Sequence, residues 1–278
     1  MTGPVGIESF VGPRPSGGTI RMLDLFPGLA VGAYSFRKLR SAYDGPCIRV
    51  RRSSDNAEQD IGFAGSGINL ASLLAFCGAG SGFAAISYDQ SGNGNHRTQT
   101  TAGNQLRIVN GGEVVTDSGF TAFDCSTGFF VMPITQSIPL QVHIVHRLVS
   151  TSSVLAFFFR DTDQNPIFVW DTRQSDRGYR FGSGTLIDSG DSSDVTNDFR
   201  LASVLYGESG QMRINKTQFV SGDTGSLGMN GIVNVWASDT GTASDRQAYE
   251  HEMIVIPGSD MFLPIEAAIA DHYGTTEL

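Results

Sequence analysis

The chain has 278 residues, of which 28 are acidic and 19 basic, and its formal net charge is −9. This balance argues against a general affinity for nucleic acid. Glycine supplies 34 residues while charged residues make up 17% of the chain, which is typical of a turn-rich β protein and not of a disordered one. No apolar stretch reaches the roughly 20 residues of a membrane-spanning helix. We therefore expect a folded protein without a membrane span.

The first residues, "MTGPVGIESFVGPRPSGG", have neither the basic start nor the apolar centre of a signal peptide. Their glycine and proline content predicts a flexible arm over residues 1–23, followed by one domain over residues 24–278. Three cysteines, Cys47, Cys77 and Cys125, form an odd set without CxxC spacing. We expect buried, reduced thiols rather than disulfides or zinc ligands, as in a protein made in a cytoplasm.

The first predicted helix falls within residues 29–43. There Ala33, Phe36 and Leu39 recur at helical spacing.

Two further helices have clearer end signals. Over residues 69–80, Asn69 can cap the start and Gly78 can end the helix. Over residues 263–274, Pro264 lies in the expected first turn. We expect both segments to be short helices.

Most of the remaining pattern has a period of two. Ile48 and Val50 alternate with arginines, and a later alternating run breaks at Asn215 and Lys216 into a hairpin. Further expected strands cover residues 141–149, 155–161, 166–173, 199–207, 232–239 and 249–258. Roughly a dozen strands joined by polar, glycine-rich turns predict an all-β protein with two packed antiparallel sheets.

A cluster of bases lies near the start of the predicted domain: Arg37, Lys38, Arg40, Arg49, Arg51 and Arg52. Such a cluster can mark a surface for an anionic partner. Four acids lie close by in the sequence: Asp44, Asp55, Glu58 and Asp60. We favour an acid–base network that uses both sets.

The stretch "YDQSGNGNHR", residues 88–97, combines an acid, amides and glycines. Counted from Asp89, it places oxygen ligands where a calcium loop of the EF-hand kind has them, but the twelfth position, which needs a bidentate carboxylate, is Thr100. The flanking residues also predict strands rather than helices. The EF-hand interpretation therefore fails.

A tight polar turn is the favoured interpretation of this stretch, with Asp89 and Asn93 accepting backbone N–H groups and Gly92 and Gly94 at positive φ. A partial calcium site or a sugar site is the alternative, so we expect no cofactor unless calcium binds here. The candidate ligand-binding residues are Tyr88, Asp89, Asn93, Asn95 and His96. A second set of aromatic and acidic side chains that could contact a sugar is Trp170, Asp171 and Trp236. The apolar runs around both tryptophans favour core positions instead.

A family resemblance is carried by "AYSFRKLRSAYDGPCIRVRRSSDNAEQDIGF", "LLAFCGAGSGF" and "SYDQSGNGN". Residues 24–110 resemble the N-terminal part of the catalytic domain of the family 54 α-L-arabinofuranosidases, and of phage and prophage proteins that borrow that domain. The rest of the chain resembles a concanavalin A-like (laminin G-like) jelly roll. The resemblance implies one antiparallel β-sandwich with a few short helices over residues 24–278.

Retaining glycosidases need two carboxyl groups about 5–5.5 Å apart. The resemblance implies a nucleophile in an Asp-x-Glu-Asn pattern and a vicinal Cys-Cys pair, and this chain has neither. Glu250 and Glu252 are predicted to alternate on one face of a strand, with His251 opposite. They form either a carboxylate pair or an outward polar face, and both interpretations stay open.

Other catalytic patterns are absent from the sequence. His143 and His146 are expected on opposite sides of a strand, so they cannot ligate one metal ion together. There is no GxSxG motif, and "GAGSGF" lacks the lysine of a phosphate-binding loop. These absences weigh against hydrolysis by a nucleophilic serine and against nucleotide binding.

The sequence favours a non-enzymatic phage virion structural protein, a tail, baseplate or head-surface fibre or decoration component. Its expected partners are other virion subunits, further copies of itself in a homo-oligomer, and a host-surface glycan held at Tyr88–His96. The expected location is the virion. The alternative is a glycoside hydrolase or depolymerase that resembles the α-L-arabinofuranosidases.

Overall fold

The structure is a computed structural model that describes residues 20–149, 156–161, 169–172, 179–188, 199–226, 228–230, 233–236, 248–259 and 262–275. Within these residues the chain consists mainly of antiparallel strands, and α1 (Leu70–Cys77) and α2 (Phe262–Tyr273) are its α-helices. The prediction of an all-β protein is therefore confirmed. Neither of these helices has the length and apolar character needed to cross a membrane.

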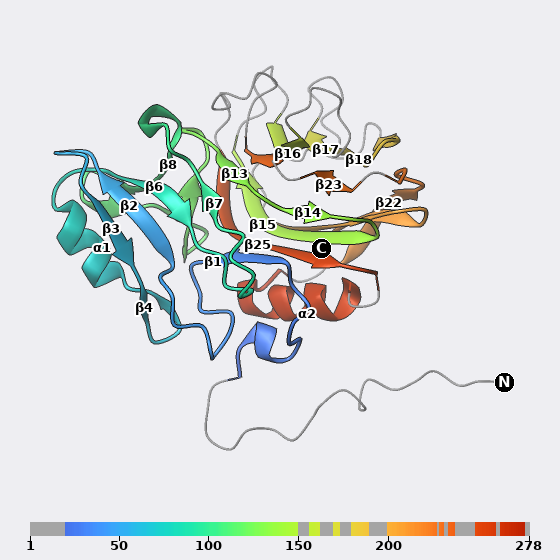
Figure 1. Cartoon of the computed structure of the whole chain (residues 1–278), viewed down its shortest axis with the longest axis horizontal. Helices are drawn as coiled ribbons and strands as arrows, with labels where there is room; N and C mark the ends of the chain where they lie inside the picture. Colours follow the sequence, from blue (N-terminus) through green and yellow to red (C-terminus); the bar gives the residue numbers. More distant parts are fainter. Residues whose placement is uncertain are drawn as a thin grey trace.

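The first layer of strands is centred on β15, whose backbone pairs with β25 on one side (Figure 1) and with β20 on the other. Across the layer the order is β1 (Gly32–Ser35), β25 (Ala248–Pro257), β15 (Leu140–Leu148), β20 (Phe199–Tyr206), β21 (Gly210–Ile214) and β22 (Thr217–Gly222). All of these pairings are antiparallel, and those that join β1, β25, β15 and β20 bring together strands that lie far apart in the sequence.

A second layer packs against the first. Its order is β3 (Glu58–Ile61), β2 (Ile48–Arg52), β6 (Gly82–Ser87), β7 (Arg97–Thr98), β13 (Phe130–Met132), β24 (Val233–Val235), β16 (Ala156–Asp161), β17 (Val169–Thr172), β18 (Tyr179–Gly182) and β19 (Leu186–Asp188). β8 (Leu106–Asn110) and β12 (Phe123–Asp124) connect this layer to β25.

Shorter elements lie between the main strands. They are the 3-10 turns η2 (Met22–Asp24) and η3 (Ala102–Asn104), and the strands β4 (Phe63–Ala64), β5 (Gly67–Ile68), β9 (Glu113–Val114), β10 (Thr116–Asp117), β11 (Phe120–Thr121), β14 (Thr135–Gln136) and β23 (Met229–Asn230).

Two hydrophobic cores follow from this arrangement. The larger core lies between the layers, and the smaller one lies between the first layer and α2, which runs beneath β15 and β25 in Figure 1. Val142 and Ile144 of β15 face the larger core, and Val145 faces the smaller one. Met22 and Leu23 are also buried in the smaller core, so the packed part of the chain includes η2.

Local sequence signals placed several elements correctly. The Asn69 side chain accepts a hydrogen bond from the Ser72 amide at 3.0 Å and so caps α1, and Gly78 follows the helix with φ of 57°. At the hairpin between β21 and β22, Asn215 and Lys216 have φ of 47° and 71°, as a two-residue turn of this kind requires.

The helix predicted within residues 29–43 is wrong, because this segment contains β1. Ala33 pairs with Ile254 and Tyr34 with Met253 on β25. Ala33 faces the smaller core and Tyr34 the larger one. A strand that is buried on both faces shows no clean alternation, so chance spacing of apolar residues imitated a helix.

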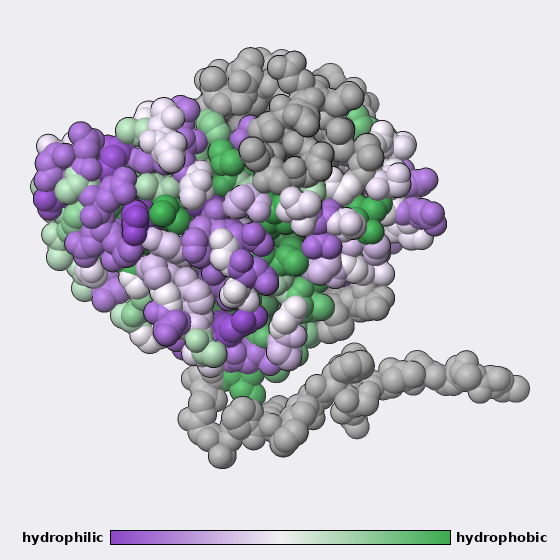
Figure 2. Space-filling view, in the orientation of Figure 1, coloured by the Kyte–Doolittle hydropathy of each residue, from purple (hydrophilic) through white to green (hydrophobic). Residues whose placement is uncertain are grey.

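The predicted acid–base network is confirmed only in part. Arg49 pairs with Asp60, and Arg52 pairs with Asp55, each at 2.7 Å. Hydrophilic residues accordingly cover the molecule over β2, β3 and α1 in Figure 2. Arg37 instead pairs with an acid far away in the sequence, described below. The prediction of free, buried cysteines is confirmed for Cys47, Cys77 and Cys125.

Candidate functional site

Asp89 organises the polar turn after β6. Its carboxylate accepts hydrogen bonds from the Ala33 amide at 2.9 Å, the Ser91 amide at 2.8 Å, the Ser91 hydroxyl at 2.7 Å and the Asn95 amide at 3.1 Å. The side chain is buried, and the contact with Ala33 ties the turn to β1. The prediction of a turn held by a buried aspartate is confirmed.

The other predicted site residues gather around the same turn. The Asn93 and Asn95 amide groups donate to the carbonyl oxygens of residues 30 and 31, each at 2.8 Å. Among the described residues no backbone N–H donates to the Asn93 side chain, contrary to the prediction. His96 Nδ1 accepts from the Asp89 amide at 3.1 Å, and the Tyr88 hydroxyl donates to an Asp60 oxygen at 2.8 Å. Most of the polar groups offered for a ligand are thus already used within the protein, and glycan binding here stays a prediction.

No group of three or more metal-ligating side chains occurs among the residues that the structure describes. His143 and His146 of β15 are both buried, and burial lowers the pKa of each to about 3. His143 Nδ1 lies 2.9 Å from the Ser203 hydroxyl, whereas the His146 ring packs near Trp236. The two histidines therefore serve different sides of the sheet, as expected.

A bulge in β25 separates the two glutamates that the sequence placed on one face. Val145 pairs with Glu252 and His146 with Glu250, so His251 is an extra residue in β25. A bulge of this kind interrupts the alternation of side chains. Glu250 consequently faces the larger core, while His251 and Glu252 face the α2 side, and the prediction of a shared face is wrong.

Glu250 forms an ion pair inside the larger core. One of its oxygens lies 2.7 Å from Arg97 Nη1, and both side chains are 1% exposed. The Trp236 indole N–H donates to the other oxygen. The Arg97 guanidinium lies 4.3 Å from the Tyr34 ring centre and 4.9 Å from that of Phe130. Trp236 is a core residue as predicted, and this cluster excludes solvent.

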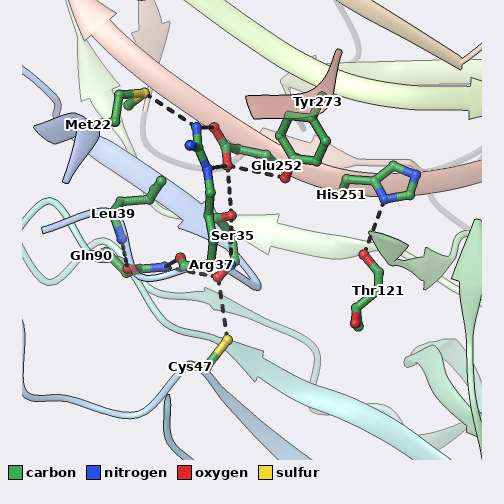
Figure 3. Close-up of polar contacts among 10 residues, drawn as sticks. All are labelled: Met22, Ser35, Arg37, Leu39, Cys47, Gln90, Thr121, His251, Glu252 and Tyr273. Carbon is green, nitrogen blue, oxygen red and sulfur yellow. Dashed lines mark hydrogen bonds and ion pairs between the residues drawn. The ribbon is translucent and has the colours of Figure 1, made fainter. Parts of the chain in front are cut away.

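Glu252 anchors a second ion pair at the α2 side (Figure 3). Its two oxygens accept hydrogen bonds from Arg37 at 2.7 and 2.8 Å. Ser35 and Tyr273 donate hydroxyl hydrogen bonds to the same carboxylate at 2.7 and 3.2 Å. Burial alone would raise the pKa of Glu252, but the charge of Arg37 and the hydrogen bonds outweigh it and lower that pKa.

His251 joins a third buried acid on the same side. Its Nε2 atom lies 3.2 Å from Asp117, and its Nδ1 atom lies 3.1 Å from the Thr121 carbonyl oxygen. Arg147 also donates to Asp117. Burial raises the pKa of Asp117, but the hydrogen bonds from His251 and Arg147 outweigh it, so the pKa is lowered. Nothing local in the sequence connects these residues.

The buried carboxylates of the described chain are therefore held by cations or by backbone N–H groups. Glu250 and Glu252 lie on opposite sides of β25 and each is bound to an arginine. They do not form the closely spaced pair that a retaining glycosidase uses. In this arrangement their ion pairs with arginines hold strands together.

A pocket of about 430 Å³ lies beside the Glu252 cluster. It is lined by residues 20–22, 36–38, 66–68, 70 and 120–121 together with His272 and Tyr273 at the end of α2. Its wall thus combines basic, aromatic and hydroxyl side chains. Sequence reasoning missed this pocket because its residues come from five separate segments.

Comparison with known proteins shows what the first part of the chain is similar to. Residues 27–124 match the family model described as the catalytic domain of α-L-arabinofuranosidase B. An α-L-arabinofuranosidase of Hypocrea jecorina is 47% identical over 68 residues, which are 24% of this chain and 14% of that protein. An arabinofuranosidase/B-xylosidase of Trichoderma koningii is 44% identical over 68 residues. The resemblance expected for the N-terminal part of the domain is confirmed.

Solved structures extend the likeness in fold to most of the chain. An arabinofuranosidase complexed with arabinofuranosyl-α-1,2-xylobiose superposes with a TM-score of 0.66 and 17% identity, covering 86% of this chain and 62% of that one. A family 54 α-L-arabinofuranosidase soaked with a cyclic sulfate inhibitor gives 0.64 and 16%. The matched part of the chain covers 14%, about one seventh, of the length of the curated relatives.

These findings correct the predicted function. The relatives are fungal arabinofuranosidases, which are enzymes by name, so the prediction of a non-enzymatic virion component located in the virion is wrong. A phage origin is not shown by any of them. The prediction failed because it gave the missing Asp-x-Glu-Asn motif more weight than the residues that build the domain.

Proposed function

We propose that this protein is a glycoside hydrolase that cleaves α-L-arabinofuranosyl groups from glycans. The observation that carries the proposal is the match of residues 27–124 to an arabinofuranosidase catalytic domain. These residues form β1, β2, β3, β6 and β8, which build one end of the second layer and the outer strand of the first. The likeness in fold over 86% of the chain supports the same assignment.

The finer fold class that accompanies this proposal is a concanavalin A-like jelly roll. Two antiparallel layers with a core between them, and strands β8 and β12 joining the layers, support it.

The catalytic carboxyl groups are proposed to lie outside the ion pairs described above. Glu250 and Glu252 are bound to arginines, and Asp89 is used by its turn. A general acid needs a proton to give, and a nucleophile needs access to the sugar, which a carboxylate buried in an ion pair does not have. The acids to test by substitution are therefore those outside these ion pairs and outside the Asp89 turn.

The test is release of 4-nitrophenol from 4-nitrophenyl α-L-arabinofuranoside by the full chain. We expect turnover in the unmodified protein, and its loss by at least about a hundredfold in single Asp→Asn variants at two of these positions, since acid–base catalysis contributes that much or more. The matched 4-nitrophenyl β-D-glucopyranoside is the control substrate and should not be cleaved. A folded full chain that releases no nitrophenol would disprove the proposal.

A further inference from the structure

The pocket beside α2 is basic on a protein whose net charge is −9. Arg21, Arg37 and Lys38 line it, and none of its lining residues is acidic. Glu252 neutralises Arg37 from behind. In the part of the chain that the structure describes, Arg21 donates to a backbone carbonyl and Lys38 has no ion pair. Among the described residues, two positive charges therefore line the pocket without a counter-ion.

Aromatic rings form another part of the wall. The Phe120 and Tyr273 ring centres are 4.9 Å apart in an edge-to-face arrangement, and Phe36 also lines the pocket. Aromatic faces pack against flat apolar surfaces, including the apolar faces of sugar rings and other aromatic rings. The pocket therefore offers both a charge for an anion and a platform for a ring.

Polar groups suited to hydroxyl recognition complete the wall. Ser66 and Thr121 line the pocket. Burial, followed by the positive charge of Arg37, lowers the pKa of His272, so this ring is neutral at pH 7 and can exchange hydrogen bonds with hydroxyl groups.

The volume limits the ligand. At about 430 Å³ the pocket falls at the lower end of the range for small-molecule sites. An α-helix is about 10 Å wide with its side chains, so the pocket is too small for a folded partner element.

We propose that this pocket binds a carboxylate group carried on a six-membered ring, with Lys38 and Arg21 facing the carboxylate and Phe120 and Tyr273 facing the ring. Two sources have this chemistry: a uronic acid residue of a glycan and an aromatic acid. The proposal is independent of the glycosidase function, because the pocket has no acidic lining residue to serve in hydrolysis.

The first experiment is calorimetric titration of the full chain with D-glucuronate and with benzoate, each against its neutral partner, D-glucose and benzyl alcohol. We expect saturable binding of at least one acid and none of its neutral partner. Binding should weaken as salt is added, because exposed charges are screened. Glucuronate binding alone identifies a glycan source, and benzoate binding alone identifies an aromatic source. Binding of neither acid overturns the proposal.

The variant Lys38→Met keeps the length of the side chain and removes its charge. It should weaken binding about tenfold, which is the usual size of a lost charged hydrogen bond. Lys216→Met is the matched control, because Lys216 lies on the β21–β22 hairpin and does not line the pocket. Equal affinity in both variants would contradict the assignment.

A second measurement needs no variant. Lys38 and Lys216 are the two lysines of the sequence, so an amine-reactive reagent followed by mass spectrometry compares them directly. The bound acid should protect Lys38 from modification and leave Lys216 unchanged. Protection of neither lysine at saturating ligand would place the binding elsewhere and overturn the proposal. Loss of arabinofuranoside hydrolysis would leave this result unaffected, so the two proposals fail separately.

Discussion

Glu250 and Glu252 lie two residues apart on β25, yet they occupy two different environments. Glu250 and its partner Arg97 are each 1% exposed and are surrounded by aromatic rings. Glu252 is equally buried, but its partner Arg37 is 16% exposed and lines an open pocket. The bulge at His251 causes the difference, because it directs the two carboxylates to opposite sides of the strand.

This comparison shows that burial of a carboxylate does not by itself define its role. An arginine enclosed with its acid depends on that acid for all of its charge compensation. An arginine that reaches solvent can exchange part of that interaction for water. Substitution of the acids in turn should therefore give effects that decrease in a fixed order.

Glu250→Gln is expected to have the largest effect. It leaves the Arg97 charge buried without a counter-ion, which typically costs about 3–5 kcal/mol in the free energy of unfolding. Denaturant unfolding followed by tryptophan fluorescence measures it. Glu58→Gln, at an exposed position on β3, is the control and should change stability by less than about 0.5 kcal/mol. Similar stability of the two variants would refute an essential ion pair at Glu250.

Glu252→Gln should destabilise the protein less, by about 2 kcal/mol, since a charged hydrogen bond is lost while water can still reach Arg37. The pKa of Glu252 is lowered from its ordinary value of 4.5. The stabilisation is then complete above that value and is lost as the pH falls through the lowered pKa of the folded protein. The stability difference between Glu252→Gln and the unmodified protein should shrink below pH 4.5. A difference that stays constant down to pH 2.5 would contradict this assignment.

Asp89→Ala compares these ion pairs with a buried carboxylate that relies on N–H and O–H donors. The change leaves the amides of Ala33, Ser91 and Asn95 without their acceptor. We expect a loss of about 1–3 kcal/mol, the usual penalty for orphaned donors. Thermal unfolding of Asp89→Ala and Asp89→Asn measures it, and Asn should recover part of the loss. Unchanged stability combined with a loss of glycan or calcium binding would instead make the turn a ligand site.

Asn69→Ala is expected to have the smallest effect on stability of these substitutions. It removes the side-chain cap of α1 at the molecular surface and should cost about 1 kcal/mol. The control Asn69→Ser keeps a capping oxygen and should stay within about 0.5 kcal/mol of the unmodified protein. A cost as large as that of Glu250→Gln would show that α1 is more than a local helix.

The candidate ligand residues are neighbours in the sequence, which is why they could be predicted to lie together. Tyr88, Asp89, Asn93, Asn95 and His96 fall within one turn, so a polar cluster there could be predicted without the fold. What could not be predicted is that the backbone of residues 30, 31 and 33 takes up many of their hydrogen bonds. Arg97, at the end of the same stretch, continues into the larger core and meets Glu250 there.

The sequence by itself determined the elements whose signals are local. Four features each depend on neighbouring residues: the cap at Asn69, the hairpin turn at Asn215 and Lys216, the helix with Pro264 in its first turn, and the alternation around Val50. Propensity, capping and turn chemistry act over a few residues, which is why these predictions were correct. The match of residues 27–124 to a known domain was readable for a related reason, because its motifs are continuous in the sequence.

The tertiary structure decided everything that depends on distant partners. Residues 32–35 form a strand because β25 supplies the other half of its hydrogen bonds, and helical spacing could not reveal that. The bulge at His251 arises where β25 pairs with β15, and it divides Glu250 from Glu252. The partners of those two acids, Arg97 and Arg37, lie more than 150 and 200 residues away in the sequence. Long-range pairing fixes these positions, because a strand's register and a buried charge's counter-ion are properties of the packed layers and not of the segment that carries them.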